Sequence, residues 1–180
     1  MIPSSVTSFA ARIGFCLALG LLASAPPVRA ADTPAALDAA GQAFVAKATA
    51  DNSMQITLAQ VALDRSQSPR VRALARRIID DHKALDRKFT AVTVARKAQG
   101  QAHGIPNRDI IEDKLQLQNL KGDAMDKAFA GMIVKEHQKI IPLYERAAKD
   151  EHNRSLQKIA REALPLLRAH LEDARALSGG

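Results

Sequence analysis

The segment SPRVRALARRIIDDHKALDRKF, residues 68 to 89, indicates the fold more clearly than any other part of the chain. Ser68 followed by Pro69 is a typical helix start, because serine caps a helix and proline fits its first turn. Apolar residues then recur at three- and four-residue spacing, which is the period of one helical face. His82 falls on that face, with Asp81 directly before it. The segment therefore predicts an amphipathic helix with a polar group on its buried side. Its apolar face consists of Val71, Leu74, Ile78, Leu85, Phe89 and Val92.

The remaining sequence has the same helical character. Strand-like alternation is absent, and the good helix formers Ala, Leu, Arg, Lys and Gln dominate. Four long helices and a short one, with a glycine- and proline-bearing loop at 100–106, predict an all-α fold. The expected architecture is an up-down four-helix bundle with a short extra helix in the crossover. The predicted helices span about residues 35–65, 69–99, 107–120, 124–150 and 154–177.

The first 30 residues have the plan of a secretory signal peptide. An apolar run from Ile13 to Ala23, too short to span a bilayer, precedes a small-residue exit at Val28-Arg29-Ala30. We predict cleavage after Ala30, a single domain over residues 31–180, no membrane span after cleavage, and a periplasmic or secreted location. An uncleaved amphipathic anchor is the alternative. The only cysteine, Cys16, lies in the leader, so the mature chain has no disulfide or thiolate site.

Charge and motifs exclude several functions. The formal net charge of +7 falls to +5 when Arg12 and Arg29 leave with the signal peptide. Basic and acidic residues are interspersed and aromatic residues are few, so we expect no nucleic-acid partner. The chain has no Gly-rich phosphate loop, His-Glu-x-x-His motif or nucleophile elbow. The sequence thus favours a protein that is not an enzyme, with no catalytic residues predicted.

Each long predicted helix carries one polar residue on its apolar side. In an up-down bundle, the turns near residues 67 and 151 lie at the same end. At about 1.5 Å per residue, the four polar residues then lie roughly 18 to 28 Å from that end. Asp81 and Glu136 each directly precede one of the histidines. The predicted layer consists of Gln55, His82, His137 and His170.

This layer has two interpretations. Imidazole and carboxylate groups gathered inside a helical bundle are suitable ligands for one transition-metal ion, held by His82, His137 and His170 with Asp81 or Glu136 in support. Alternatively, the same groups form a hydrogen-bonded network that sets the helix register without a cofactor. We rank the cofactor-free network first, because the layer also carries an amide, Gln55, in place of a further carboxylate.

Several motifs together resemble a known family. They are Gln55-Ile56-Thr57-Leu58, Ser68-Pro69-x-Val71, Asp80-Asp81-His82, Glu136-His137 and Leu164-Pro165 followed by His170. This ordered set resembles the domain of unknown function 4142, a family of exported ferritin-like proteins, over roughly residues 43–177. The resemblance implies a ferritin-like four-helix bundle outside the cytoplasm and no settled activity.

The chain departs from that family's pattern. Gln55 stands where the family commonly has Glu, and no histidine has Glu three residues before it, as ferritin-like di-metal sites require. A di-iron oxidase is therefore not expected. The leading hypothesis is a soluble binding or envelope and stress-related protein, acting on an unknown small ligand or envelope partner. The alternatives are a metal-binding protein or mononuclear metalloenzyme, and a purely structural interaction module.

Overall fold

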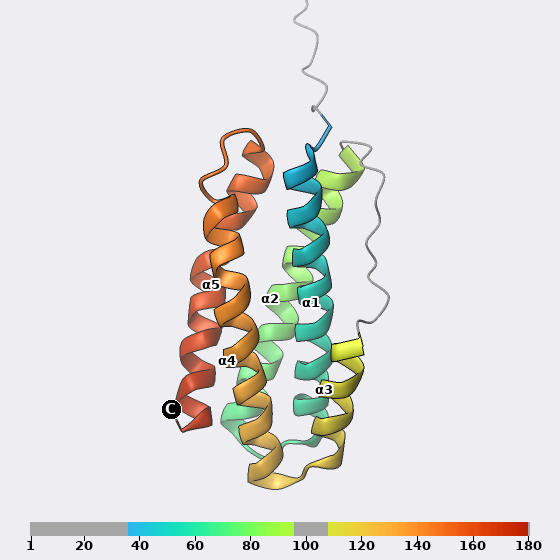
Figure 1. The fold of residues 1–180 in the computed structure, drawn as a ribbon. Coiled ribbons are helices and arrows are strands. Elements are labelled where there is room, and N and C mark those ends of the chain that lie inside the picture. The colour runs from blue at the N-terminus through green and yellow to red at the C-terminus, as the bar shows by residue number, and fades with distance from the viewer. Residues whose placement is uncertain (1–35, 96–107, 180) are drawn as a thin grey trace, which may run out of the picture. The chain divides into compact units, whose positions relative to one another are not determined.

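A computed structural model describes residues 36–95 and 108–179, and every regular element in those ranges is a helix. All five helices belong to one compact unit, Asp32–Gly180. This confirms the predicted all-α class, and the helix ends lie within a few residues of the predicted ones. The predicted leader, residues 1–30, and the 100–106 loop lie outside the described residues. The helices, labelled in Figure 1, are α1 Ala39–Arg65, α2 Pro69–Ala95, α3 Arg108–Asn119, α4 Gly122–Ala147 and α5 Arg154–Ser178.

Local sequence explains where the helices begin. The carboxylate of Asp38 accepts a hydrogen bond from the backbone N–H of Gly41 at 2.7 Å and caps α1. The hydroxyl of Ser68 accepts from the backbone N–H of Val71 at 3.4 Å, as predicted for the start of α2. Gly122 has a φ of 53°, which a residue with a side chain rarely adopts, and this allows the tight turn from α3 into α4.

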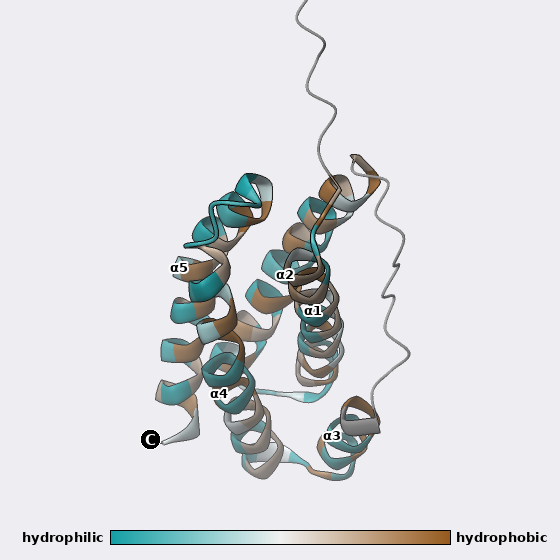
Figure 2. Cartoon of the chain, turned by 45° about the horizontal axis from the view of Figure 1, so that its top comes forward, coloured by the Kyte–Doolittle hydropathy of each residue, from teal (hydrophilic) through white to brown (hydrophobic). Residues whose placement is uncertain are grey.

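The helices pack as two antiparallel pairs, α1 with α2 and α4 with α5 (Figure 1). The pairs meet along two seams, where α2 contacts α5 and α1 contacts α4. The short helix α3 packs against α1 and α4, and Figure 2 shows it beside them. In the described part of the chain, no helix has the length and apolar character needed to cross a bilayer.

Two separate apolar clusters fill the interior. Along α2, the first cluster ends at Ile79 and the second begins at Leu85. Along α4, the corresponding boundary lies between Ile133 and Ile140. The gap between the clusters therefore falls at the same height on neighbouring helices. The buried polar residues that fill it are Asp51, Asn52, His82, Glu136, His137 and His170.

The apolar face predicted for α2 is buried at Val71, Leu74, Ile78, Leu85 and Phe89, and Val92 is half-buried. On α5, Leu167 is fully buried, whereas the neighbouring Leu166 is only half-buried. The inward positions on this helix run from Ala163 to Leu167 and then to His170, a spacing of four and three residues. This spacing keeps His170 on the same helical face as the leucine before it.

We predict that Phe129→Ala lowers the free energy of unfolding by about 3 to 5 kcal/mol, because the ring is fully buried and its removal leaves a cavity. Urea denaturation monitored by circular dichroism measures the loss. Leu115→Ala on α3 is the control: its side chain is 52% exposed, so the change should stay within about 0.5 kcal/mol. Equal effects of the two substitutions would contradict this packing.

Candidate metal centre

Three imidazole rings meet in the gap between the two apolar clusters. His82 comes from α2, His137 from α4 and His170 from α5, and all three side chains are fully buried. Their ring centroids lie 5.3 to 5.8 Å apart. Each ring offers one nitrogen, and these three nitrogens lie within 4.8 Å of one another. We call these three residues the histidine layer.

The hydrogen bonds of His82 determine which of its nitrogens carries the proton. The amide nitrogen of Asn52 donates to the carboxylate of Asp86 at 2.6 Å, so the Asn52 oxygen faces His82. That oxygen lies 2.8 Å from Nδ1 of His82 and can only accept. The proton of the neutral imidazole therefore sits on Nδ1. The other nitrogen, Nε2, is buried and carries a lone pair, and it has no hydrogen-bond partner among the described residues.

His137 is held in the same tautomer by the backbone of its own helix. Its Nδ1 lies 3.0 Å from the carbonyl oxygen of Ile133, which can only accept. The neutral ring therefore directs the lone pair of Nε2 toward His170, whose Nδ1 is 3.3 Å away. His82 and His137 thus both direct an unprotonated Nε2 into the layer.

His170 cannot satisfy both of its neighbours as a neutral ring. Its Nε2 lies 2.9 Å from the Asp81 carboxylate, which accepts, and its Nδ1 faces the lone pair of His137. A proton on Nε2 leaves two lone pairs facing each other, and a proton on Nδ1 leaves a lone pair facing a carboxylate. Only an additional cation, either a second proton on His170 or a metal ion among the rings, resolves the conflict.

Burial disfavours the second proton. Burial, together with the neighbouring His137 and His170, lowers the pKa of His82 well below its ordinary value of 6.5. Burial, with a smaller effect of His170, lowers the pKa of His137 to about 3. Burial also lowers the pKa of His170, although the hydrogen bond and charge of Asp81 act in the opposite direction. All three rings are therefore neutral at pH 7, and neutral imidazole is the form that binds metals.

The spacing of the rings suits a metal ion. Zinc binds imidazole nitrogen at about 2.0 to 2.1 Å in tetrahedral geometry, which places two ligand nitrogens about 3.3 Å apart. The separation of His137 Nε2 and His170 Nδ1 is 3.3 Å. The nitrogen of each ring that faces away from the layer already has a carbonyl, amide or carboxylate partner. This is the outer shell that orients metal-bound histidines in proteins.

The two predicted acids lie in different environments. Asp81 reaches from α2 to His170 on α5 and supports that ring rather than facing the layer itself. Glu136 lies on the α4 face toward α1, where it accepts from Lys139 at 3.3 Å. Gln55 is fully buried, and among the described residues its amide contacts the Asp51 carboxylate on the same helix rather than a histidine. A direct role of Glu136 or Gln55 in metal binding stays a prediction.

The residue on α1 that contacts a histidine is Asn52, which sequence reasoning missed. Asn52 is fully buried and hydrogen-bonds His82, with Asp86 behind it. A signal was available, because Asn52 lies four residues after Ala48 and three before Gln55, on the same inward face. Its partner Asp86 follows His82 by four residues and so lies on the same side of α2.

Comparison with known proteins gives one match. A family model described as "Domain of unknown function (DUF4142)" matches residues 26–177, which is most of the chain. No curated protein and no solved structure matches. The match provides a family without an activity, so the chemistry of the site must come from the residues themselves.

We predict that the metal-free protein loses stability as the pH falls below about 6.5. The unfolded chain takes up protons on its histidines there, while His82 and His137 stay neutral in the folded protein. His82 and His137 then each contribute a slope of up to about 1.4 kcal/mol per pH unit to the free energy of unfolding. Urea denaturation between pH 7 and pH 4, with a chelator present, measures the slope.

The comparison that isolates this effect uses His82→Asn, which keeps a donor for Asn52 but has no titrating ring. As the pH falls, the free energy of unfolding of this variant should decrease less steeply than that of the wild type. For His152→Asn, at an exposed turn, it should decrease as steeply as for the wild type. Asp51 acts in the opposite direction, because burial and the nearby Glu136 raise its pKa from 3.8 to about 7. It contributes equally to all three proteins. Identical slopes for His82→Asn and the wild type would contradict a neutral buried layer.

Proposed function

The chain belongs to the DUF4142 family of domains of unknown function, and we propose that it binds one transition-metal ion between His82, His137 and His170. One observation carries this proposal: neither neutral tautomer of His170 satisfies both Asp81 and His137. A metal ion that takes the lone pairs of the three rings removes the conflict and leaves the outer hydrogen bonds unchanged.

The ligand chemistry narrows the choice of metal. Three neutral imidazoles suit zinc, copper, nickel or iron, and the only cysteine, Cys16, lies in the predicted leader. Zinc is the preferred candidate, because it accepts three histidines plus one further ligand in tetrahedral geometry. The full burial of all three rings supports a site that holds a metal away from solvent rather than a catalytic centre open to substrate.

We further propose a ferritin-like four-helix bundle for α1, α2, α4 and α5, with α3 as the extra helix of the crossover. The antiparallel helix pairs and their two seams support this. A di-iron centre does not fit, because the ligand set has three histidines, and the carboxylate of Asp81 hydrogen-bonds His170 behind the ring. The leader sequence supports a working location outside the cytoplasm, where the site would handle extracytoplasmic metal.

The second candidate is a network that sets the helix register without any ligand. The contact of Asn52 with His82 joins α1 to α2, and the contact of Asp81 with His170 joins α2 to α5. Such buried polar contacts can specify how helices align. In this case the protein would recognise an envelope partner through its exposed faces, and metals would leave it unchanged.

We predict that the purified full-length protein binds one equivalent of zinc and that removal of one ligand nitrogen weakens binding at least a hundredfold. His82→Asn and His170→Gln are the variants of choice. Asparagine can replace the Nδ1 donor to Asn52, and glutamine can replace the Nε2 donor to Asp81, so each variant keeps the outer hydrogen bond. Elemental analysis gives the stoichiometry, and competition with a chromophoric chelator gives the dissociation constant.

His152→Asn is the matched control and should bind zinc like the wild type, because His152 lies at an exposed turn. Zinc at a hundred times its dissociation constant should raise the free energy of unfolding by about 2.7 kcal/mol. Less than about a tenth of an equivalent of zinc, copper, nickel or iron, with no shift in thermal unfolding, would favour the network over the metal site.

Asp81→Asn tests the outer shell. The asparagine side chain can still accept a hydrogen bond from His170. The substitution removes the negative charge of Asp81, which makes the His170 imidazole a stronger ligand. We predict one equivalent of bound zinc with a dissociation constant about tenfold higher, since outer-shell partners typically account for 10- to 100-fold in affinity. Arg77, the exposed neighbour of Asp81 at 3.9 Å, provides the control Arg77→Gln, with an expected change below threefold. An unchanged affinity in Asp81→Asn would contradict a role for this carboxylate.

A further inference from the structure

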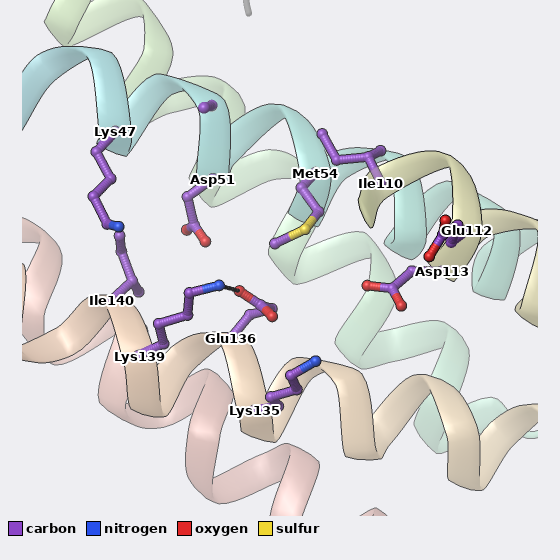
Figure 3. Close-up of a pocket in the computed structure, with 11 residues that line it drawn as sticks. Lys47, Asp51, Met54, Ile110, Glu112, Asp113, Lys135, Glu136, Lys139 and Ile140 are labelled. Atoms are coloured by element: carbon purple, nitrogen blue, oxygen red, sulfur yellow. Dashed lines mark hydrogen bonds and ion pairs between the residues drawn. The ribbon is translucent and has the colours of Figure 1, made fainter. Parts of the chain in front are cut away.

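A pocket lies on the seam between α1 and α4, with α3 at one end (Figure 3). Its volume is about 280 Å³. Asp51 from α1 and Glu136 from α4 both direct their carboxylates into it. These two acids are 8% and 4% exposed, so they form the buried floor of the pocket. Three lysines and two further acids line its exposed rim.

The floor contains polar atoms without partners. Oδ2 of Asp51 is buried and accepts no hydrogen bond among the described residues. One helical turn further along α1, the fully buried Gln55 has an amide whose only hydrogen-bond contact among the described residues is with the Asp51 carboxylate. Buried polar atoms are rarely left in this state, and an unoccupied ligand position is one recognised cause.

These groups lie close enough to influence one another. Burial, followed by the neighbouring Glu136 carboxylate, raises the pKa of Asp51 to about 7, and the Gln55 amide offsets this only in part. Two carboxylates therefore lie in one poorly hydrated space, with the Gln55 amide beside Asp51. Oxygen donors from acids and amides are the ligands preferred by hard divalent cations.

A cationic side chain already approaches this position. The ammonium of Lys139 lies 3.3 Å from a Glu136 oxygen, and its charge also acts on Asp51. Figure 3 shows it between the two carboxylates. The Lys139 side chain is 58% exposed, so it can withdraw to solvent at little cost. A divalent ion would replace one positive charge by two and would bring several oxygens into contact at once.

We propose that Asp51, Glu136 and Gln55 form a second cation site that takes a hard divalent ion such as Mn²⁺ or Ca²⁺. This site is separate from the histidine layer: its donors are oxygens rather than imidazole nitrogens, and they come from α1 and α4 only. Lys139 occupies the position when no metal is bound and competes with the ion. The two sites thus select different metals by ligand chemistry.

The test is a titration of the full-length protein with Mn²⁺ at pH 8, in which the electron paramagnetic resonance signal of free Mn²⁺ gives the dissociation constant. Asp51→Asn and Glu136→Gln should each weaken binding at least tenfold, because each removes one carboxylate. Lys139→Gln should strengthen binding at least threefold, because it removes the competing charge. Asp64→Asn, an exposed acid on the same helix, is the matched control and should change binding less than twofold.

The variants His82→Asn and His170→Gln distinguish this site from the proposed zinc site. They should keep Mn²⁺ binding, and Asp51→Asn should keep zinc binding, so either site can fail without the other. Thermal unfolding confirms that each variant is folded. Mn²⁺ binding that is lost in the histidine variants but kept in Asp51→Asn would overturn the proposal. So would absence of Mn²⁺ binding at millimolar concentration in both the wild type and Lys139→Gln.

Discussion

The structure depends on one constraint: three imidazoles are buried between two apolar clusters, and each of their six ring nitrogens needs a partner. Water is excluded from all three rings, so the protein itself must provide these partners. A carbonyl, an amide and a carboxylate satisfy the nitrogens on the outside of the layer. The nitrogens on the inside face one another, and hydrogen bonds between neutral rings cannot satisfy them all.

This constraint explains the arrangement of the helices around the layer. The clusters on either side bury large side chains, which stabilises the fold and fixes the height of each histidine. The partners of the rings come from α1, α2 and α4, so a change in the register of one helix would break a contact with another. The polar α1–α4 seam has a different character, with carboxylates and lysines instead of rings. The buried imidazoles and the carboxylates of this seam therefore lie on separate sides of α4.

The sequence predicted the all-α class and the approximate helix positions, because helical periodicity and capping are local properties. Prediction of the helical face through Leu74, Ile78 and His82, and of the helix start at Ser68, required no knowledge of distant residues. The convergence of three histidines also followed, since height along a helix can be counted from the turns. The hydrogen bonds could not be predicted, because they depend on rotamers and helix rotation. Thus Asp81 contacts His170 on another helix, and Asn52 rather than Gln55 contacts His82.

The sequence also could not separate Glu136 from His137. Adjacent residues on a helix differ by about 100° in direction, so one enters the histidine layer and the other enters the pocket beside α1. The ranking of the two interpretations changes for a similar reason. Residue types alone favoured a cofactor-free network, whereas the tautomers required by Ile133, Asn52 and Asp81 leave lone pairs that a network of neutral rings cannot satisfy.

X-ray absorption at the zinc edge of protein carrying one equivalent of zinc tests the central claim most directly. The account predicts three imidazole nitrogens at about 2.0 to 2.1 Å, with the multiple-scattering pattern of histidine and one further light ligand. A spectrum of hydrated zinc, or one with fewer than two imidazoles, would contradict a metal site in the histidine layer.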